Sequence, residues 1–529
     1  MKPRACWGSQ EMRLLNETIA FSLQPGVGAP VWTGRAANGE ELRRFAAAAR
    51  SADGRMAAIW GSDERLRGGG FRLHCVFGLN EGHAWISLDL PVDNPVYPDL
   101  SGFFSAANRM QRATRDMVGI ATTGGDQRPW LRHGAWPADW YPLRHDAAPQ
   151  DFPNAPSDYD FVKVGGEGAH EIPVGPIHAG IIEPGHFRFS VIGEKVLRLE
   201  QRLGYQHKGV EKLFIGADVA AGAKLVGRIS GDSTCAYAWA YASAVESACG
   251  LKPSPRALSL RALMLERERI ANHLGDLGAL GNDAALAFGL TQFMRLKEDW
   301  LRLNARLFGH RFMMDRIVPG GVAVDLEPAA LAAIVDQCDF IGREVRALRM
   351  IYVEHAGLQD RFMTTGIIDA DLARELSLTG MAARCTGILL DGRSYRQGYT
   401  PPAPYSVLGV RPATDERGDV AARAGVRFDE IIESLRLLRE IAVGLPDADV
   451  CAELTPVPGA AGLGVIEGWR GEVLVGVAFD AAGKLARVHP HDPSWQIWPA
   501  LEHAVMRDIV PDFPLINKSF NLSYSGVDL

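Results

Sequence analysis

The chain has 529 residues, of which 47% are hydrophobic and 22% charged, and its formal net charge is −7. This composition is ordinary for a globular protein, and the length predicts about two to four domains with a large core. The negative charge gives no reason to expect direct binding to nucleic acid or to an anionic membrane surface. No apolar run reaches the roughly 18 residues of a transmembrane helix, and the first residues lack the apolar segment of a secretory signal. We therefore expect a cytoplasmic protein, which something else would have to hold if it sits at a membrane.

The seven cysteines are odd in number and widely spaced, and no two of them are separated by two residues. Zinc ribbons and ferredoxin-type iron–sulfur clusters need such closely spaced pairs. We therefore expect buried thiols in a reducing compartment, and no iron–sulfur cluster held by this chain.

Residues 1–150 are predicted to form a small α/β domain. Apolar stretches rich in β-favouring residues and bounded by Gly, Asn and Pro predict strands at 55–60, 71–78 and 83–91. A helix is expected over 100–120, with its end at Gly119. A segment rich in Pro, Ala and Asp follows, and it predicts a linker at 151–165.

Residues 166–529 are predicted to form a second domain that long helices dominate. Alternating apolar residues predict β-structure over 186–205, before the helices begin. Apolar residues at helical spacing then predict long helices at 254–280, 290–316, 327–356 and 426–445. Ser254 followed by Pro255 is typical of a helix start. Several helices of this length imply a bundle with a buried interior.

Strands return over 464–480, and a last helix is expected over 495–510. The apolar residues of the tail, 512–529, predict that it packs into the core. The fold class is therefore α+β: an N-terminal α/β domain followed by a helical bundle with small flanking β elements.

Two short polar motifs precede the helical region. Glycine and proline place His178, Glu183 and His186 on a tight connection, where they either face a pocket or form a turn with hydrogen-bonded histidines. A second motif, residues 207–211, puts a histidine, a lysine and a glutamate within one helical turn and is typical of a solvated face.

From residue 175 onward the chain resembles the large subunit of membrane-bound, energy-converting nickel–iron hydrogenases and the related 49-kDa, quinone-site subunit of respiratory complex I. The stretches that carry the resemblance, in family order, are GPIHAGIIEPGHFRF, YQHKGVEKL, SAVESACG, LMLERERIANHLGDLG, MMDRIVPGGV, DGRSYR, PPAPY, GDVAARAGVRFDEIIES and DFPLINKSF. Residues 75–146 resemble the 30-kDa partner subunit of complex I, through YPDLSGFFSAANRMQRATRDMVGI and WPADWYPLRHD. The fusion of both parts in one chain is similar to the large subunit of the group 4 hydrogenases, the hydrogenase-4 and formate-hydrogenlyase type.

The nickel-bearing members of this family bind their metals through an Arg-x-Cys-Gly-x-Cys motif and a C-terminal Cys-x-x-Cys motif. The resemblance places these four ligand positions on Ser230, Ser233, Ser523 and Gly526. Nickel and low-spin iron prefer anionic sulfur, whereas a serine hydroxyl is hard and stays neutral, and Gly526 has no side chain. The nickel-ligand cysteines are thus absent, and we expect that this chain binds no metal.

Two interpretations of the former metal cavity are open. In the first, Ser230, Asp232 and Ser523 line a polar cavity that still binds or reacts. In the second, the cavity is merely refilled, with its hydroxyls bonded to backbone, as buried polar groups must be.

The resemblance also bears on quinone binding. The complex I subunit offers a histidine pair in its first hairpin turn and a tyrosine before the helix. The first histidine matches His178, whereas the second falls on Ile182 and the tyrosine falls near Gly231. A quinone headgroup needs hydrogen-bond donors and a proton supply, so the two missing positions count against a standard quinone site. His178, Arg228 and Asp232 are the candidate residues for a quinone pocket.

Three further residues receive candidate catalytic roles from the resemblance. Glu183 resembles the proton-gate glutamate of hydrogenases, and we expect it to transfer protons with a pKa raised by burial. Asp391 and Arg393 resemble an Asp-x-Arg motif near the family's pocket. The alternative for this pair is a structural ion pair at the edge of the bundle.

The resemblance implies the large electron-transfer subunit of a membrane-associated NADH-quinone oxidoreductase or hydrogenase-4-like complex, without the nickel–iron site, that couples redox chemistry to ion translocation. Electrons would arrive from a small subunit with a 4Fe–4S cluster, and antiporter-like and anchor subunits would hold the chain on the inner face of the cell membrane. Quinone is a candidate ligand. NAD would act only through other subunits, because no Gly-x-Gly-x-x-Gly motif follows a predicted strand. The alternatives are a redox-inert scaffold subunit and a genuine nickel–iron hydrogenase.

Overall fold

The computed structural model describes residues 10–24, 26, 28–134, 136–148, 152, 159–177 and 182–529. The chain divides into two compact units. The smaller unit comprises Met1–Pro25, Ala29–Asp160 and Tyr395–Thr400, and the larger one comprises Gly26–Gly28, Phe161–Ser394 and Pro401–Leu529. Residues 151 and 153–158 of the expected linker lie outside the described residues.

A five-stranded sheet in the order β1-β2-β5-β4-β3 forms the centre of the smaller unit. β2 and β5 are parallel, and the other neighbours are antiparallel. The three predicted strands are confirmed as β3 (Arg55–Asp63), β4 (Phe71–Leu79) and β5 (Gly82–Leu90). The sequence did not predict β1 (Phe21–Leu23), β2 (Val31–Ala36) or α2 (Gly39–Ser51).

The helix expected over 100–120 is shorter than predicted. It is α3 (Ala107–Val118), and it ends as expected at Gly119, whose φ of 80° only glycine adopts easily. The residues before it form turns because Asp99 binds the backbone N–H of Ser101 at 2.9 Å, and the Gln111 side chain binds the N–H of Leu100 at 2.9 Å. Such local side-chain bonds compete with helix formation.

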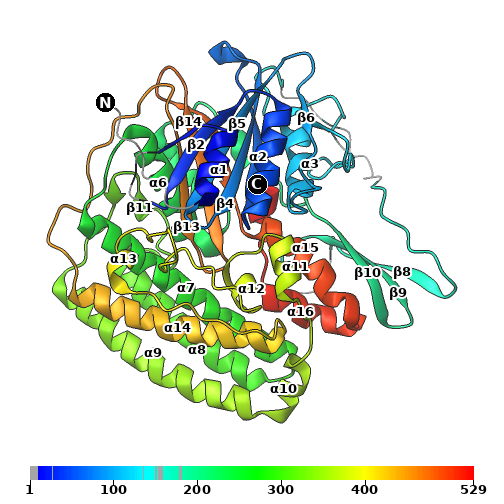
Figure 1. The fold of residues 1–529 in the computed structure, drawn as a ribbon. Coiled ribbons are helices and arrows are strands. Elements are labelled where there is room, and N and C mark those ends of the chain that lie inside the picture. Colours follow the sequence, from blue (N-terminus) through cyan, green and yellow to red (C-terminus); the bar gives the residue numbers. More distant parts are fainter. Residues whose placement is uncertain are drawn as a thin grey trace. The chain divides into compact units, whose positions relative to one another are not determined.

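Four long helices of the larger unit lie side by side as a bundle (Figure 1): α7 (Pro255–Asp283), α8 (Ala287–Phe308), α9 (Pro328–Glu354) and α14 (Val420–Val443). The Ser254 side chain caps α7, as predicted, by accepting the N–H of Ala257. α8 stops at Gly309 instead of running to residue 316, because Gly309 takes a left-handed conformation. α14 begins six residues earlier than predicted, because Asp419 caps it.

A second layer pairs α6 (Thr234–Cys249) with an antiparallel sheet of β13 (Ala461–Glu467), β14 (Glu472–Phe479) and β15 (Leu485–His491). The helix and β13 approach closely at two glycines. A Cβ atom at Gly464 would lie 2.0 Å from the carbonyl oxygen of Ala240, and one at Gly462 would lie 2.1 Å from that of Ala244. Small residues on both elements therefore hold the middle of α6 against β13.

The predicted hairpin region is a three-stranded sheet of β8 (Ala169–Val174), β9 (His186–Ile192) and β10 (Lys195–Arg202). The last predicted helix is α15 (Ser494–Ala504), which ends early in a 3₁₀ turn at Val505–Arg507. The tail packs into the core, as predicted, through α16 (Phe513–Phe520) and α17 (Ser525–Asp528), and Leu529 is only 2% exposed.

The remaining helices and strands are short. They are α1 (Gln10–Thr18), β6 (Val96–Pro98), β7 (Ala121–Thr123), α4 (Val210–Phe214), α5 (Val219–Val226), β11 (Ile317–Val318), β12 (Gly321–Val322), α10 (Ala356–Phe362), α11 (Ala370–Glu375), α12 (Gly380–Arg384) and α13 (Tyr405–Leu408). None of the helices in the described residues combines the length and the apolar character that crossing a bilayer demands.

The contact between α6 and β13 leads to a stability prediction. We expect Gly464→Ala to lower the free energy of unfolding by about 3 kcal/mol, because the new methyl group collides with backbone that cannot rotate away. Urea unfolding of the purified chain measures the change. Gly165→Ala is the control, since nothing lies within 4 Å of a Cβ at that exposed position. Equal stability of the two variants would show that α6 shifts freely on the sheet.

Candidate functional site

The two segments that carry the former ligand positions meet in the larger unit. The Ser230 Oγ lies 3.0 Å from the Ser523 Oγ and donates to Asp232 Oδ1 at 2.7 Å. The Ser523 Oγ in turn accepts the backbone N–H of Gly526 at 2.9 Å. Residues from the entry of α6, from the tail and from the turn between β13 and β14 form one cluster. We call it the polar site: Ser230, Asp232, Ser233, Arg470 and Ser523.

Arg470, which the sequence did not single out, is the cation of the polar site. Its guanidinium group binds both carboxylate oxygens of Asp232, at 2.9 and 2.5 Å. It also donates to the Ser233 Oγ at 3.2 Å and, through Nε, to the carbonyl oxygen of Asn521 at 2.5 Å. The arginine comes from the turn between β13 and β14, where it stacks 4.0 Å above the ring of Trp469.

Asp232 and Arg470 are both charged at neutral pH. Burial opposes ionisation of Asp232, but Arg470 outweighs this effect and lowers the pKa of the carboxyl to about 2. The same pairing raises the pKa of Arg470 above its ordinary value, against the effect of burial. The hydroxyls of the site are bonded mainly to side chains. Within the described residues, no group of three or more His, Cys, Asp or Glu side chains is arranged to hold a metal ion.

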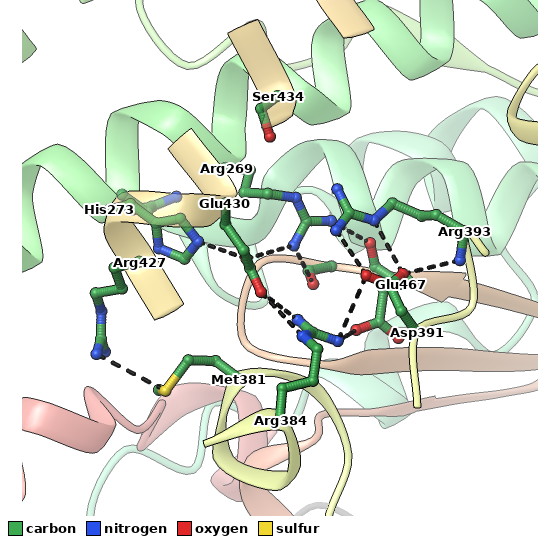
Figure 2. A network of polar contacts seen from close by, with 12 residues as sticks. Arg269, His273, Met381, Arg384, Asp391, Arg393, Arg427, Glu430, Ser434 and Glu467 are labelled. Carbon is green, nitrogen blue, oxygen red and sulfur yellow. Dashed lines mark hydrogen bonds and ion pairs between the residues drawn. The ribbon is translucent and has the colours of Figure 1, made fainter. Parts of the chain in front are cut away.

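A network of buried charges fills the interior beside α7 and α14 (Figure 2). Arg384 lies at its centre, 2.6 Å from Glu430 and 2.8 Å from Glu467. His273, on α7, contacts the other oxygen of Glu430 at 2.7 Å. Arg269 binds the backbone oxygens of Glu467 and Gly468, at 2.8 and 3.0 Å. These contacts join α7, α12, α14 and β13.

Asp391 and Arg393 belong to this network, and they lie in the interior rather than at the edge of the bundle. They form a two-bond ion pair, at 3.0 and 2.7 Å, and are 1% and 3% exposed. Arg393 also reaches Glu266 at 3.0 Å. Glu266 accepts further bonds from Tyr405 at 2.7 Å and from the Ser434 hydroxyl at 2.6 Å. Each partner of the Asp391–Arg393 pair is thus fully bonded inside the protein.

The carboxyl groups of the network differ in how easily they bind a proton. Burial opposes ionisation of Glu430, but Arg384 and His273 outweigh it and hold its pKa well below the ordinary value. The pKa of Asp391 is also lowered, because Arg393 and Arg384 outweigh burial. Burial dominates at Glu467 and raises its pKa. Burial lowers the pKa of His273, which favours its neutral form. Glu467 is therefore the carboxyl of these three that takes up a proton most readily.

Glu183 lies against the tail. Its Oε2 accepts the backbone N–H groups of Tyr524, at 3.2 Å, and of Ser525, at 3.1 Å. These two residues directly follow Ser523, so Glu183 adjoins the polar site through the backbone. His178 lies outside the described residues. His186 is bonded to the carbonyl oxygen of Gly175 at 3.1 Å.

Two other polar residues lie elsewhere than expected. Arg228 forms an ion pair with Asp315, with Nη2 and Oδ2 2.7 Å apart, and its side chain is 46% exposed, so its guanidinium group is engaged outside the polar site. The motif at residues 207–211 is a solvated face only in part, because Lys208 is exposed, His207 is half-buried and Glu211 is buried. Glu211 is 3% exposed and lies 2.6 Å from Arg487 and 2.9 Å from His489, because β15 covers it.

Comparison with protein families gives two matches. Residues 276–458 match the family described as the respiratory-chain NADH dehydrogenase 49 Kd subunit. Residues 36–153 match the family described as the respiratory-chain NADH dehydrogenase 30 Kd subunit. The first match covers most of the bundle and part of the network, and the second covers most of the smaller unit.

Curated relatives match across both parts. The chain is 29% identical over 489 residues to formate hydrogenlyase subunit 5 of Escherichia coli (strain K12). The aligned region covers 90% of this chain and 85% of that protein. It is also 29% identical over 489 residues to hydrogenase-4 component G of the same organism, with 90% of this chain and 84% of that protein aligned. A subunit of the NADH-quinone oxidoreductase of Bacteroides thetaiotaomicron is 25% identical over 418 residues, with 74% and 77% covered. These relatives are oxidoreductase subunits, and the chain itself is a fusion of a 30-kDa-type domain and a 49-kDa-type domain of the respiratory-chain NADH dehydrogenase families.

Proposed function

We propose that the chain is the large electron-transfer subunit of a membrane-associated oxidoreductase complex of the NADH-quinone oxidoreductase and hydrogenase-4 type. In this proposal it lacks a nickel–iron site and takes part in coupling redox chemistry to ion translocation. The names of its relatives support the class of complex. The residues at the former ligand positions support the loss of the metal, because none of them offers a thiolate.

One observation carries the proposal: the buried network contains a carboxyl group, Glu467, that lies 2.8 Å from Arg384 and whose pKa burial raises above its ordinary value. The network ends near the polar site, since the rings of His273 and Trp469 make an edge-to-face contact with centroids 6.1 Å apart. The indole N–H of Trp469 donates to the backbone oxygen of Asp232 at 2.9 Å. A proton or electron arriving at the polar site would therefore alter the electrostatic energy of the network.

Glu268 adds a second titratable group beside the polar site. It is 5% exposed, and its carboxyl accepts the backbone N–H groups of Cys235, at 2.6 Å, and Ala236, at 3.2 Å. Burial raises its pKa to about 8, and the charge of Asp232 acts in the same direction. A carboxyl that holds a proton at neutral pH in this place suits proton exchange with the polar site.

The cofactors of this reaction would lie in other subunits. A small subunit would hold the 4Fe–4S cluster that delivers electrons, and this chain would bind no cofactor of its own except, as a candidate, a quinone. Antiporter-like and anchor subunits would hold the chain on the inner face of the cell membrane. NAD would react only at another subunit.

The bonding within the polar site favours a second candidate, a redox-inert scaffold subunit. The hydroxyls of Ser230, Ser233 and Ser523 all have partners inside the protein, so the site is complete without a ligand. A scaffold would tolerate changes to single carboxyl groups and would be sensitive to changes on its helix surfaces.

The make-up of the native complex is the first test of the proposed function. We expect mass spectrometry of the assembly purified from native membranes to identify an iron–sulfur small subunit and antiporter-like membrane subunits. Elemental analysis of the same sample should find no nickel. A soluble chain without partners would refute the electron path and the membrane coupling, and hydrogen uptake or evolution that tracks nickel content would instead establish a hydrogenase.

A substitution at Glu183 separates the enzyme from the scaffold. We expect Glu183→Gln to lower quinone reduction by the purified complex at least ~100-fold, because an amide keeps the bonds to the tail but cannot exchange a proton. Reduced viologen serves as the electron donor, and mass spectrometry of the intact complex confirms assembly. Glu194→Gln, an exposed position in the neighbouring hairpin, is the control. Wild-type turnover in Glu183→Gln would remove its role in proton transfer.

Glu268 predicts how stability depends on pH. Its folded pKa, about 8, exceeds the ordinary value of 4.5, so the folded chain binds a proton that the unfolded chain releases between these values. The contribution of this group is favourable at low pH and is lost as the pH rises toward 8, by at most about 1.4 kcal/mol per pH unit.

The measurement compares unfolding of the wild type and of Glu268→Gln at several pH values. We expect the variant to become more stable relative to the wild type as the pH rises from 5 to ~8. Glu194→Gln again serves as the control, because its carboxyl is in water. Parallel stability curves for Glu268→Gln and the wild type would show that Glu268 is ionised in the folded chain.

A further inference from the structure

The polar site does not fit a nickel–iron centre. Serine hydroxyls occupy three of the four ligand positions, and they are poor ligands for soft metals. The fourth position, Gly526, has no room for a cysteine side chain: a Cβ atom there would lie 2.6 Å from Asp492 Oδ2 and 2.8 Å from the Ser523 Oγ. Asp492 cannot give way easily, because it accepts bonds from the Tyr237 hydroxyl at 2.7 Å and from the Ser494 N–H at 2.8 Å.

A metal bound at the former ligand positions would join two segments, residues 228–233 and 520–526. In this structure side chains of the protein itself join the same two segments. Arg470 binds Asp232 and Ser233 in the first segment and the carbonyl oxygen of Asn521 in the second. The contact between the hydroxyls of Ser230 and Ser523 adds a direct connection.

The geometry of Arg470 suits this task. A guanidinium group is planar, is permanently charged and has five N–H donors, so one side chain can bind a carboxylate with two bonds and still reach a third partner. The side chain of Arg470 is 5% exposed and packs on Trp469, which restricts its movement. Hydrogen bonds between charged partners are among the stronger ones in proteins. The Asp232 side chain is 36% exposed, so solvent screens part of this attraction.

We propose that the Arg470 guanidinium group, held by Asp232, replaces the metal as the cationic cross-link between the entry of α6 and the C-terminal tail. The site is then assembled and kept in shape with no metal ion. This inference rests on the nickel-free part of the proposed function, and it adds which group does the joining.

Hydrogen exchange of the tail amides tests the proposal in the assembled complex. The amides of Ser523, Tyr524, Ser525 and Gly526 all bond to side chains near the polar site, so they report whether the tail is held. We expect Arg470→Met to speed their exchange at least ~10-fold, because the tail loses its charged connection to the entry of α6 and keeps the contact between the neutral hydroxyls of Ser230 and Ser523. Arg470→Lys should give an intermediate increase, since an ammonium group cannot bind Asp232 and Asn521 together in the same way.

Arg261→Met is the matched control. Arg261 is equally buried and pairs with Glu246 at 2.5 Å, but its bonds are to residues of α6 and the β11–β12 hairpin rather than to the tail. We expect it to leave exchange of the four tail amides at the wild-type rate. If Arg470→Met fails to assemble, Asp232→Asn keeps the shape of the site and removes the charge, and it should also speed exchange of these amides. Wild-type exchange in either Arg470→Met or Asp232→Asn would overturn the proposal.

Metal content separates this inference from the proposed function. Nickel and zinc are measured in the purified complex, and tail exchange in the wild type is repeated after treatment with the chelator dipicolinate. We expect neither metal in stoichiometric amount and no effect of the chelator. Bound nickel together with a loosened tail would refute both proposals. A nickel-free complex in which Arg470→Met leaves exchange of the tail amides at the wild-type rate would refute only the proposed cross-link.

Discussion

Arg384 is the charge on which the interior of the helical bundle depends. Its side chain is fully buried, and it holds Glu430 of α14 and Glu467 of β13 with bonds of 2.6 and 2.8 Å. Without it these carboxylates would face each other with too little positive charge, and removing one partner of a buried ion pair costs about 3–5 kcal/mol. The short helix α12, which carries Arg384, therefore fixes the bundle against the sheet.

The polar site and the buried network are connected by one tight turn. Glu467 at the end of β13 belongs to the network, and Arg470, three residues later, belongs to the polar site. Trp469 lies between them, with its ring in edge-to-face contact with His273 and its N–H bonded to Asp232. A change in charge on one side of the turn therefore acts on the other side through space and through packed side chains. The turn also carries the cationic group on which the proposed cross-link depends.

Much of the fold could be predicted from the sequence, because local rules govern it. The long helices were evident from apolar spacing, the start of α7 from Ser254, and the end of α3 from Gly119. One error arose where a side chain binds backbone nearby: Asp99 replaces the first turns of the expected helix by bonding to Ser101. Periodicity does not detect such bonds.

The candidate site was predictable only in part. Motif matching identified the serines at the former ligand positions, and the structure brings Ser230 and Ser523 together although 293 residues separate them. Arg470 was missed because its partner, Asp232, is 238 residues away and nothing local marks the pair. The available signal was an arginine between two glycines in a turn between predicted strands, since glycines there allow a close approach of backbone. Arg228 was a candidate only because it belongs to the segment that carries the former ligand positions. In the structure its guanidinium group pairs with Asp315.

Two buried acidic residues, Glu268 and Asp528, help to distinguish an enzyme subunit from a scaffold. The carboxyl of Glu268 accepts backbone N–H groups at the start of α6, and burial raises its pKa to about 8. Asp528, in the tail, accepts two backbone N–H groups, and burial raises its pKa to about 7. A glutamine or an asparagine at these positions would accept the same hydrogen bonds without an ionisable group. A purely structural protein would therefore gain nothing from the cost of burying these carboxyl groups. Residues that reduce stability in this way are concentrated at functional sites. Both acids adjoin segments that form the polar site, and this placement favours a subunit that moves protons over one that only joins its partners.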